Sequence, residues 1–399
     1  MVNFDIKEFC CGCGACANKC PHKAISMKAD DNGFLSPQID TEKCTNCGLC
    51  DIVCPHLNAK TNISQLDKGA WLYSSDNSEA KLLSSSGGAF YELAKAFIEK
   101  CGLVVGCSWN DNLEAEHVII DNVEELKKLQ GSKYVQSNTK NIYQEILKEI
   151  LKGNKVLFSG TPCQVSAAHN YISSYKNGKY REQLLTVGVI CHGISSPKVW
   201  NSFKTWISNK EKSKLVGVNF RDKSREGYKK SYCKYIFESG KILYQPTFLP
   251  SSKYMESTIV YNLAIRNCCS HCDCKGINGA CDIILGDWYA EYSGKGSLGT
   301  SCIVAFTNRG KLFAENNLKD LRSFSYNEVL DQNSFIEKSV KISPRRDEFL
   351  SKLNDDIWDG VEEFYPKKYI VKKLLVKIGI FDSIKRNIAL IKKSLKDVI

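Results

Sequence analysis

Nine cysteines lie within the first 56 residues of this 399-residue sequence. Eight of them form two copies of one pattern, in which four cysteines are separated by two, two and three residues and a Pro-His pair follows the last one. The second copy lies 34 positions after the first. The repeated cysteines are Cys10, Cys13, Cys16, Cys20, Cys44, Cys47, Cys50 and Cys54. Because thiolates are soft ligands, cysteines at this density predict iron–sulfur clusters or a zinc site.

The spacing favours iron–sulfur clusters. In bacterial two-cluster ferredoxins, three closely spaced thiolates bind one 4Fe-4S cube, and the fourth, which precedes a proline, binds the other cube. Zinc sites use two separate Cys-x2-Cys pairs, not four cysteines within eleven residues. The pattern predicts one cluster on Cys10, Cys13, Cys16 and Cys54, and a second on Cys44, Cys47, Cys50 and Cys20. Cys11 is left over and is interpreted as a bystander.

Composition narrows the class of protein. Hydrophobic residues make up 43% and charged residues 25%, a globular balance that excludes collagen-like, coiled-coil and wholly disordered chains. No run of 18 apolar residues predicts a membrane-spanning helix, and the first residues lack an apolar signal segment. We therefore expect a cytoplasmic protein whose 20 cysteines stay reduced and serve metal binding or catalysis.

The net charge of +11 is concentrated in a tail. Residues 366–399 hold ten Lys or Arg and two Asp, a net of +8, so the other 365 residues carry only +3. Apolar residues in the tail step by three or four, which predicts a basic amphipathic helix. Such a helix packs on its own protein or a partner, or it associates with an anionic membrane surface. Nucleic-acid binding is not expected, because the tail lacks interleaved aromatic residues.

From residue 71 onward, strand-like and helix-like segments alternate, which predicts an α/β fold with a mixed sheet and flanking helices. A small α+β domain of the bacterial ferredoxin type precedes it. The main predicted strands cover 103–107, 156–158, 184–191, 215–220, 232–237, 282–285 and 302–306. The main predicted helices cover 88–100, 123–130, 142–151 and 197–208, with another beginning at Thr161.

Three further motifs could carry chemistry. Thr161-Pro162 opens a helix directly after a strand, and the positive helix N-terminus could bind a phosphate or lower the pKa of Cys163. Cys191-His192 follows another strand, where α/β sheets place their sites, although a structural pair is the alternative. The segment 268–274 holds four cysteines, of which Cys269 and Cys272 have a Cys-x2-Cys spacing. With Cys163 and Cys191 they could bind a third 4Fe-4S cluster, with zinc as the alternative.

These segments together resemble the coenzyme F420 hydrogenase/dehydrogenase beta-subunit family, in its long form with a fused N-terminal ferredoxin domain. The resemblance extends from the cysteine repeat to about residue 310. The matching stretches are SSSGGAF (84–90), His117, GSKYVQS (131–137), VLFSGTPCQV (156–165), VICHGISSP (189–197), NFRDKS (219–224), RNCCSHCDCK (266–275), DIILGDW (282–288) and KGSLG (295–299). The additional Cys268, Cys274 and Cys281 depart from the family pattern and leave several ligand sets open.

The resemblance implies FAD bound beside iron–sulfur clusters in the α/β domain. It assigns flavin or pocket contacts to Ser86, Gly87, Gly88, Lys133, Tyr134, Gly160, Thr161, Arg221 and Lys223. It assigns Cys163, Cys191, Cys269 and Cys272 to a third cluster. The candidates for proton transfer are His192, His117 and Asp287.

We therefore expect three parts: a two-cluster ferredoxin domain (1–60), a flavin-binding oxidoreductase domain (70–365) and the basic tail (366–399). The favoured hypothesis is an enzyme that passes electrons between 4Fe-4S clusters and an organic substrate through FAD, with a ferredoxin or another redox partner at the other end. The resemblance allows coenzyme F420 or another organic compound as that substrate. The second hypothesis is an electron-transfer subunit that serves a partner enzyme and has no substrate of its own. The third is a zinc-stabilised binding module.

Overall fold

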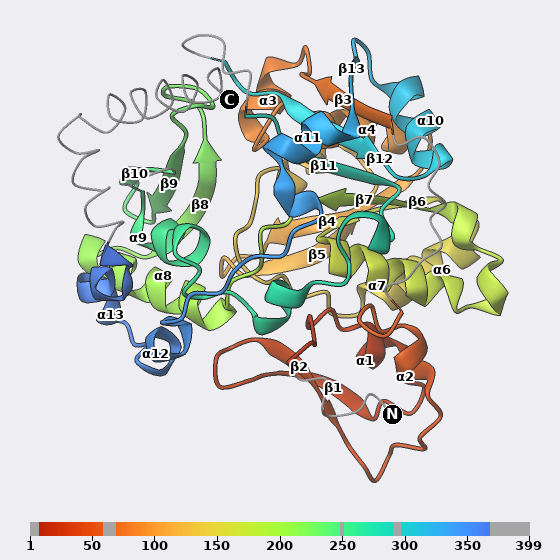
Figure 1. Cartoon of the computed structure of the whole chain (residues 1–399), viewed down its shortest axis with the longest axis horizontal. Helices are drawn as coiled ribbons and strands as arrows, with labels where there is room; N and C mark the ends of the chain where they lie inside the picture. The colour runs from red at the N-terminus through yellow and green to blue at the C-terminus, as the bar shows by residue number, and fades with distance from the viewer. Residues whose placement is uncertain (1–7, 59–68, 248–250, 290–296, 368–399) are drawn as a thin grey trace, which may run out of the picture.

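A computed structural model describes residues 8–58, 69–247, 251–289 and 297–367 (Figure 1). The predicted basic helix of the tail and most of the stretch between the first two domains lie outside these ranges. Among the described helices, none is both long enough and apolar enough to cross a membrane.

The N-terminal segment (residues 8–58) repeats one local structure twice. Its elements are α1 (Ala15–Lys19), β1 (Ile25–Ala29), β2 (Leu35–Ile39) and α2 (Leu49–Ile52), with β1 and β2 paired antiparallel. Gly14 precedes α1 with a φ of 76°, and Gly48 precedes α2 with a φ of 72°. Residues other than glycine avoid this left-handed conformation, so the repeated Cys-Gly step sets both turns. The sequence repeat is therefore also a structural repeat.

The remainder of the chain is built on an eight-stranded mixed sheet. Four central strands are parallel, because β6 pairs in parallel with β4 and β7, and β7 pairs in parallel with β11. The other neighbouring pairs are antiparallel. Across the sheet the strands are β13 (Arg322–Phe324), β3 (Gly69–Tyr73), β12 (Ser301–Ala305), β11 (Ile283–Asp287), β7 (Leu184–Val189), β6 (Val156–Gly160), β4 (Leu103–Trp109) and β5 (Ala115–Ile120). The predicted α/β class is confirmed.

Helices cover both faces of this sheet. Along β6, Val156 and Phe158 face one hydrophobic core while Leu157 faces another, as the two-residue period of a strand requires. On the first face lie α6 (Ile142–Leu151) and α7 (Pro162–Ser173). On the second lie α4 (Ala89–Ile98), α5 (Leu126–Leu129) and α10 (Asn308–Asn317). The shorter helices α3 (Ser78–Leu83) and α11 (Tyr326–Gln332) lie near the edge that β3 and β13 form (Figure 1).

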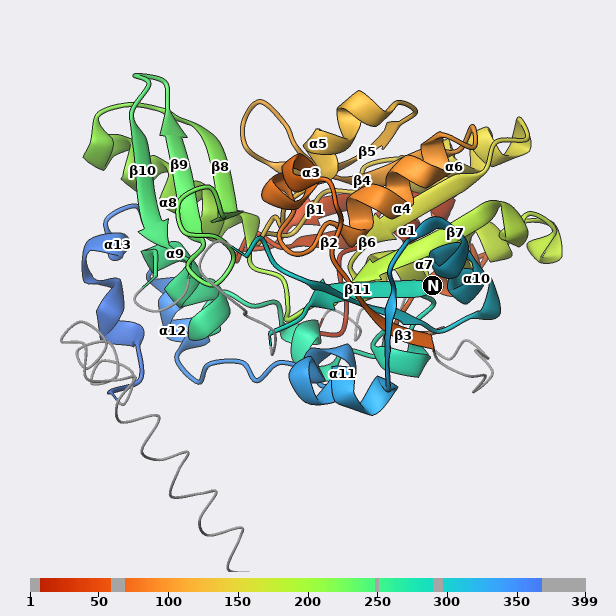
Figure 2. The same cartoon turned by 90° about the horizontal axis from the view of Figure 1, so that it is seen from above.

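A second, smaller unit was not separated by the sequence analysis. The strands β8 (Leu215–Asp222), β9 (Tyr232–Phe237) and β10 (Ile242–Pro246) form their own antiparallel sheet, set apart from the large sheet (Figure 2). It shares an aromatic core with α8 (Pro197–Glu211), α9 (Lys253–Met255), α12 (Arg346–Ser351) and α13 (Ile357–Gly360). That core holds Trp200, Phe203, Trp206, Tyr235, Tyr254 and Trp358. Strand patterns locate β8 and β9, but they do not say which sheet a strand joins.

A buried acid holds the carboxyl-terminal part of the sheet together. Asp282, just before β11, is 1% exposed, and its carboxylate accepts hydrogen bonds of 2.8 Å from both the backbone N–H and the hydroxyl of Thr186. The same carboxylate lies 2.6 Å from Arg309 and 3.5 Å from Arg181. Burial raises the pKa of Asp282, but the two arginines outweigh burial and hold this pKa below its ordinary value.

Replacing Asp282 by Asn is expected to destabilise the fold by about 3–5 kcal/mol, because two partly buried arginines lose their counterion. Urea unfolding at neutral pH measures the loss, with Asp111→Asn on an exposed turn as the matched control. The contribution is present above the ordinary Asp pKa of about 3.9 and disappears as the pH falls through the lower folded value. The wild type and the variant should therefore converge at acid pH, and a constant difference would contradict this account.

Candidate functional site

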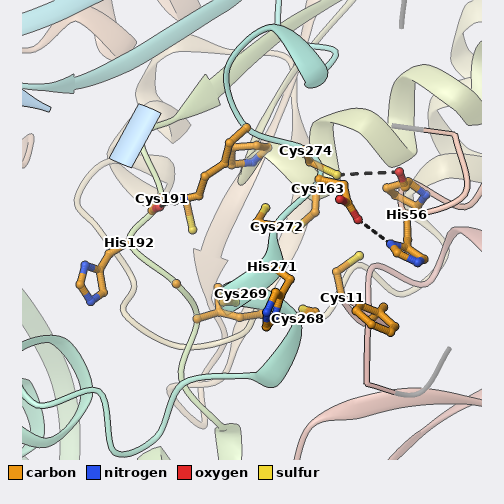
Figure 3. A pocket seen from close by; sticks show the side chains of 17 residues that line it. Cys11, His56, Cys163, Cys191, His192, Cys268, Cys269, His271, Cys272 and Cys274 are labelled. Carbon is orange, nitrogen blue, oxygen red and sulfur yellow. Dashed lines mark hydrogen bonds and ion pairs between the residues drawn. The ribbon is translucent and has the colours of Figure 1, made fainter. Parts of the chain in front are cut away.

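Seven cysteines from three distant parts of the chain line one cavity, termed here the thiol cavity (Figure 3). The N-terminal segment contributes one, the turns after β6 and β7 contribute one each, and the loop before β11 contributes four. They are Cys11, Cys163, Cys191, Cys268, Cys269, Cys272 and Cys274. The parallel pairing of β6 with β7 explains why the two strand-end cysteines meet, because both strands end at the same edge of the sheet.

The structure brings together the four cysteines that the sequence assigns to a third cluster. The thiol of Cys191 interacts electrostatically with those of Cys269, Cys163 and Cys272. Burial raises the pKa of Cys191, whereas a hydrogen bond from Cys274 is the main cause that lowers the pKa of Cys272 to about 7. The ligand assignment itself remains a prediction.

Three further thiols line this cavity. The sequence analysis left Cys268 and Cys274 as additional cysteines and interpreted Cys11 as a bystander. The thiol of Cys268 interacts with that of Cys269, Cys274 with Cys272, and Cys11 with Cys163. Cys11, interpreted as a bystander, therefore lies beside a predicted third-cluster ligand. The sequence feature that could have indicated this is the position of Cys11 outside the repeated spacing, since a thiol that the N-terminal clusters do not use can serve another site.

In the N-terminal segment, the thiols predicted for the first cluster lie close to one another. Cys16 interacts electrostatically with Cys10 and Cys54, and Cys13 interacts with Cys16 and Cys54. Burial raises the pKa of Cys16 to about 12. The second predicted set lies further out, since Cys47 is exposed.

The helix start at Thr161 forms as predicted, but its electrostatic consequence differs. Thr161 is the N-cap of α7, Pro162 is its first residue, and the Gln164 side chain accepts a 3.1 Å hydrogen bond from the Thr161 N–H. The pKa of Cys163 is nevertheless raised, first by its hydrogen bond to Cys11 and then by burial. The net shift is thus upward, and its two largest causes are the neighbouring thiol and burial.

A larger cavity of about 640 Å³ adjoins the thiol cavity. The two share walls at Cys11, Cys163 and the turn after β7 (191–194). Of the residues assigned to the flavin or to proton transfer, those that line it are Ser86, Gly88, Lys133, Tyr134, Gly160, Thr161, Arg221, Asp287 and His192. The ends of β6, β7 and β11 thus line the larger cavity, and the residues that follow β6 and β7 line both cavities.

The first turn of α4 supplies backbone donors to the larger cavity. Gly88, Ala89 and Phe90 line it, and Gly88 caps the helix with a φ of 88° and no side-chain cap. The first N–H groups of a helix have no acceptor within the helix and carry partial positive charge. The hydroxyls of Ser85 and Ser132, which lie 2.8 Å apart, line the same cavity. This wall can bind an anion such as a phosphate.

Two lysines assigned to the flavin by resemblance donate hydrogen bonds to backbone carbonyls. Lys133 lines the larger cavity, but its ammonium donates to the carbonyls of Lys128 (3.1 Å) and Gln130 (2.8 Å) at the end of α5. Lys223 is not among the lining residues, and its ammonium donates to Ser86 and Leu298 carbonyls. Burial lowers the pKa of Lys133 to about 8 and that of Lys223 to about 7.

Gly87 is not among the residues that line the larger cavity. A Cβ atom on Gly87 would lie 2.6 Å from the Ser301 nitrogen and 2.6 Å from the Tyr73 oxygen. Only glycine therefore lets the loop before α4 approach β3 and β12 this closely.

An ion pair lies in the wall of the larger cavity. The Arg221 guanidinium is 3.0 Å from the Asp287 carboxylate and donates to the Tyr134 hydroxyl at 3.2 Å. Burial opposes the charge of Arg221, but Asp287, Tyr134 and Tyr228 together outweigh burial and raise its pKa above the ordinary value. Arg221 is therefore a permanent cation at the edge of the cavity.

The two candidate histidines differ in their positions. His192 lines both cavities, its Nε2 is 2.7 Å from Asn262 Oδ1, and its ring is directed away from the thiols (Figure 3). His117 lies on β5 behind Ser137 and does not line either cavity. Burial lowers the pKa of His117 to about 4, and its ring stacks on Phe158. His117 is thus a buried, neutral residue outside the lining of both cavities.

Among the residues that the structure describes, no three Cys, His, Asp or Glu side chains are arranged to hold a single metal ion. A 4Fe-4S cube is bound at four separate corners, so its thiolates need not converge on one point.

Two sequence families match the chain. Residues 9–58 match the 4Fe-4S dicluster domain. Residues 153–322 match the family described as the C terminus of the coenzyme F420 hydrogenase/dehydrogenase beta subunit. The resemblance to the coenzyme F420 hydrogenase/dehydrogenase beta-subunit family is confirmed over residues 153–322, and that to a two-cluster ferredoxin domain over residues 9–58. Together the two matches indicate an oxidoreductase subunit that transfers electrons through 4Fe-4S clusters.

Similarity beyond the family is distant. A chain of the F420-reducing nickel–iron hydrogenase complex from Methanosarcina barkeri has 18% sequence identity and a TM-score of 0.46. The similarity covers 74% of this chain and 91% of that chain. No curated protein matches the sequence.

The N-terminal segment is held against the α/β part by buried polar contacts. Arg266 is 4% exposed, and its Nε donates to the Cys10 carbonyl at 2.6 Å. Gln136 donates to the Cys11 carbonyl at 3.3 Å, and its own side-chain oxygen accepts a hydrogen bond from Arg266 at 3.2 Å. Gly12 has a φ of 67°, and a Cβ there would come within 2.7 Å of both side chains. The turn after Cys10 is thus fixed in place.

Replacing Arg266 by Ala is expected to loosen this turn, because a charged hydrogen bond contributes about 1.5–3 kcal/mol. Hydrogen exchange of peptides covering residues 8–20 measures the effect, and exchange should be faster than in the wild type. Arg225→Ala, on an exposed loop, is the matched control. Unchanged exchange in the Arg266 variant would show that other contacts hold the segment.

Proposed function

We propose that this protein is an iron–sulfur flavoprotein oxidoreductase. It passes electrons between the 4Fe-4S clusters of its N-terminal domain (1–60) and an organic two-electron substrate, using FAD and a third cluster in its α/β domain (70–365). A ferredoxin or another redox partner is the one-electron partner at the N-terminal domain. The observation that carries the proposal is the shared wall between the thiol cavity and the larger cavity.

The donors of the thiol cavity suit a 4Fe-4S cluster. Its lining holds seven thiols, which are the ligands of such clusters, and three of them, Cys11, Cys163 and Cys191, also line the larger cavity. Buried thiols without a cation prefer to stay protonated, as the raised pKa values of Cys163 and Cys191 indicate. Bound iron would supply the positive charge that favours the thiolate form. Cys163, Cys191, Cys269 and Cys272 are the ligands that we propose.

The larger cavity suits a dinucleotide such as FAD. Its volume falls within the range of about 300–1,000 Å³ that is common for cofactor sites. The N–H groups at the start of α4, together with the hydroxyls of Ser85 and Ser132 in the same lining, offer donors to the pyrophosphate. When bound, FAD exchanges electrons singly or in pairs and so connects one-electron clusters to a two-electron organic reaction.

Three residues of the larger cavity can act on the substrate or the cofactor. Arg221 presents a fixed positive charge that can bind an anionic group, and Asp287 orients it. The amide of Asn262 donates to the Lys341 carbonyl at 2.9 Å, so its oxygen faces His192 and accepts the proton on Nε2. His192 therefore keeps a lone pair on Nδ1, and Nδ1 is the atom that we propose to accept or return a proton during turnover.

The composition of anaerobically purified protein tests the proposal. We expect about twelve irons, an equal amount of acid-labile sulfide and one FAD per chain. Cys272→Ser should lower the iron content by about four while the N-terminal clusters remain. Cys101→Ser, at an exposed position, is the control. About eight irons without FAD in the wild type would instead favour an electron-transfer subunit without a substrate of its own.

A negative charge introduced at position 132 tests the proposed position of the pyrophosphate. Ser132→Asp places a carboxylate beside the proposed pyrophosphate, and like charges repel. FAD should bind about tenfold more weakly or worse, which corresponds to a loss of about 1.4 kcal/mol. Ser132→Asn has the same shape without the charge and should bind FAD nearly as well as the wild type. Equal affinities for the Asp and Asn variants, measured by flavin fluorescence titration, would place the pyrophosphate elsewhere.

A further inference from the structure

A buried lysine lines the thiol cavity. Apart from histidines, the charged side chains among the described residues of this lining are Asp273 and Lys275. The Asp273 side chain is 47% exposed, and its carboxylate lies 2.6 Å from His56 Nδ1. Lys275 is only 6% exposed. Of these two charges, that of Lys275 is therefore the one that water screens least.

The hydrogen bonds of Lys275 match its protonated form. Its ammonium donates to the carbonyls of Cys191 at 2.7 Å, Lys338 at 2.8 Å and Phe335 at 3.1 Å. An ammonium has three N–H donors and a neutral amine has two, so three carbonyl acceptors suit the charged group. The same nitrogen lies over the Phe335 ring, 5.2 Å from its centre, where the π face attracts a cation.

In the described part of the chain, these hydrogen bonds leave the charge of Lys275 without a counterion. All three acceptors are neutral carbonyls, and they occupy the three donors of the ammonium. A charge is costly to bury unless an opposite charge lies near it. Cys191, whose carbonyl binds Lys275, is also a proposed ligand of the third cluster. A cube with four thiolate ligands is anionic, so it would supply the opposite charge.

We propose that the buried charge of Lys275 raises the reduction potential of the third cluster, so that this cluster accepts electrons more readily from the N-terminal clusters. This inference rests on the proposed function, because it requires the third cluster. Reduction adds one electron, which an N-terminal cluster gives up, and no covalent bond forms or breaks. Lys275 keeps its proton and binds no iron. Its positive charge stabilises the added negative charge, and a buried site strengthens this effect.

A purely structural role is the alternative. Lys275 joins the loop before β11 to the turn after β7 and to residues 335–338. A lysine that only held these segments together would act through its N–H donors, and a neutral donor could replace it. A lysine that sets the potential acts through its charge, which a neutral donor does not supply.

A redox titration of the third cluster separates the two roles. Wild type, Lys275→Gln, Lys275→Met, Lys275→Arg and Lys338→Gln are purified anaerobically, and their iron and sulfide contents are compared. Glutamine keeps N–H donors without a charge, methionine has neither, and arginine has both. Lys338→Gln is the matched control, because it removes a neighbouring charge that is exposed to water.

Each protein is equilibrated at a series of potentials, and electron paramagnetic resonance measures how much of the third cluster is reduced. The signal of this cluster is identified as the one that Cys272→Ser lacks. We expect Lys275→Gln and Lys275→Met to keep all three clusters and to shift the third one to a lower potential. At the wild-type midpoint, the ratio of reduced to oxidised cluster should fall about tenfold, which corresponds to about 59 mV for a one-electron couple.

The other two variants should stay near the wild-type potential. Lys275→Arg keeps the charge, and the charge that Lys338→Gln removes is screened by water and salt. An unchanged potential in Lys275→Gln would overturn the inference, as would a shift confined to Lys275→Met, which would leave Lys275 a structural role alone. An equal shift in Lys275→Arg or Lys338→Gln would also overturn it. So would the loss of the third cluster from Lys275→Gln, because Lys275 would then be needed to assemble the site.

The wild-type sample separates this inference from the function on which it rests. A wild-type protein without a third-cluster signal would overturn the proposed function and the inference about Lys275 with it. A wild-type protein with three clusters, together with an unchanged potential in Lys275→Gln, would overturn only the inference about Lys275.

Discussion

Parallel pairing of β6, β7 and β11 is the constraint on which both cavities depend. Parallel strands end at one edge of a sheet, so the turns after them meet without any further device. Here those turns deliver Cys163 and Cys191, while the end of β11 delivers Asp287. Because the strands are buried on both faces, helices must cover them, and the edge is left as the place where other groups can approach. The N-terminal segment and the cysteine-rich loop both pack there.

The buried cationic side chains near the site have different partners. The ammonium groups of Lys133 and Lys223 donate hydrogen bonds to backbone carbonyls, and burial lowers the pKa of each. Arg221 keeps its charge because Asp287 lies beside it. The walls of the larger cavity thus offer one stable cation and a row of backbone N–H groups. An anionic ligand with an apolar body is the chemistry that such walls accept most readily.

Much of the fold could be predicted from the sequence, because local patterns determine local structure. The strand expected at 232–237 is β9 residue for residue, and the helix expected at 142–151 is α6. Thr161-Pro162 marked its helix start correctly because capping chemistry is local. The position of β8 and β9 in a separate sheet could not be predicted, since it depends on the aromatic core around Trp200. The same holds for Cys11, which lines a cavity with Cys163, and for Lys223, which donates to the Ser86 carbonyl 137 positions earlier, because no local motif encodes such distant neighbours.

The two halves of the N-terminal repeat differ at two of the positions that precede their helices. Gly12 corresponds to Asn46, which has a φ of 56°, and Cys11 corresponds to Thr45. Asparagine tolerates the left-handed conformation, so the second half of the repeat needs no glycine at position 46. The first half needs Gly12, because a Cβ there would collide with the side chains of Gln136 and Arg266. The two halves of the sequence repeat are therefore not equivalent in the structure, because one half faces the protein interior and the other faces outward. Such an arrangement gives electron flow an inside and an outside terminal within fifty residues of chain.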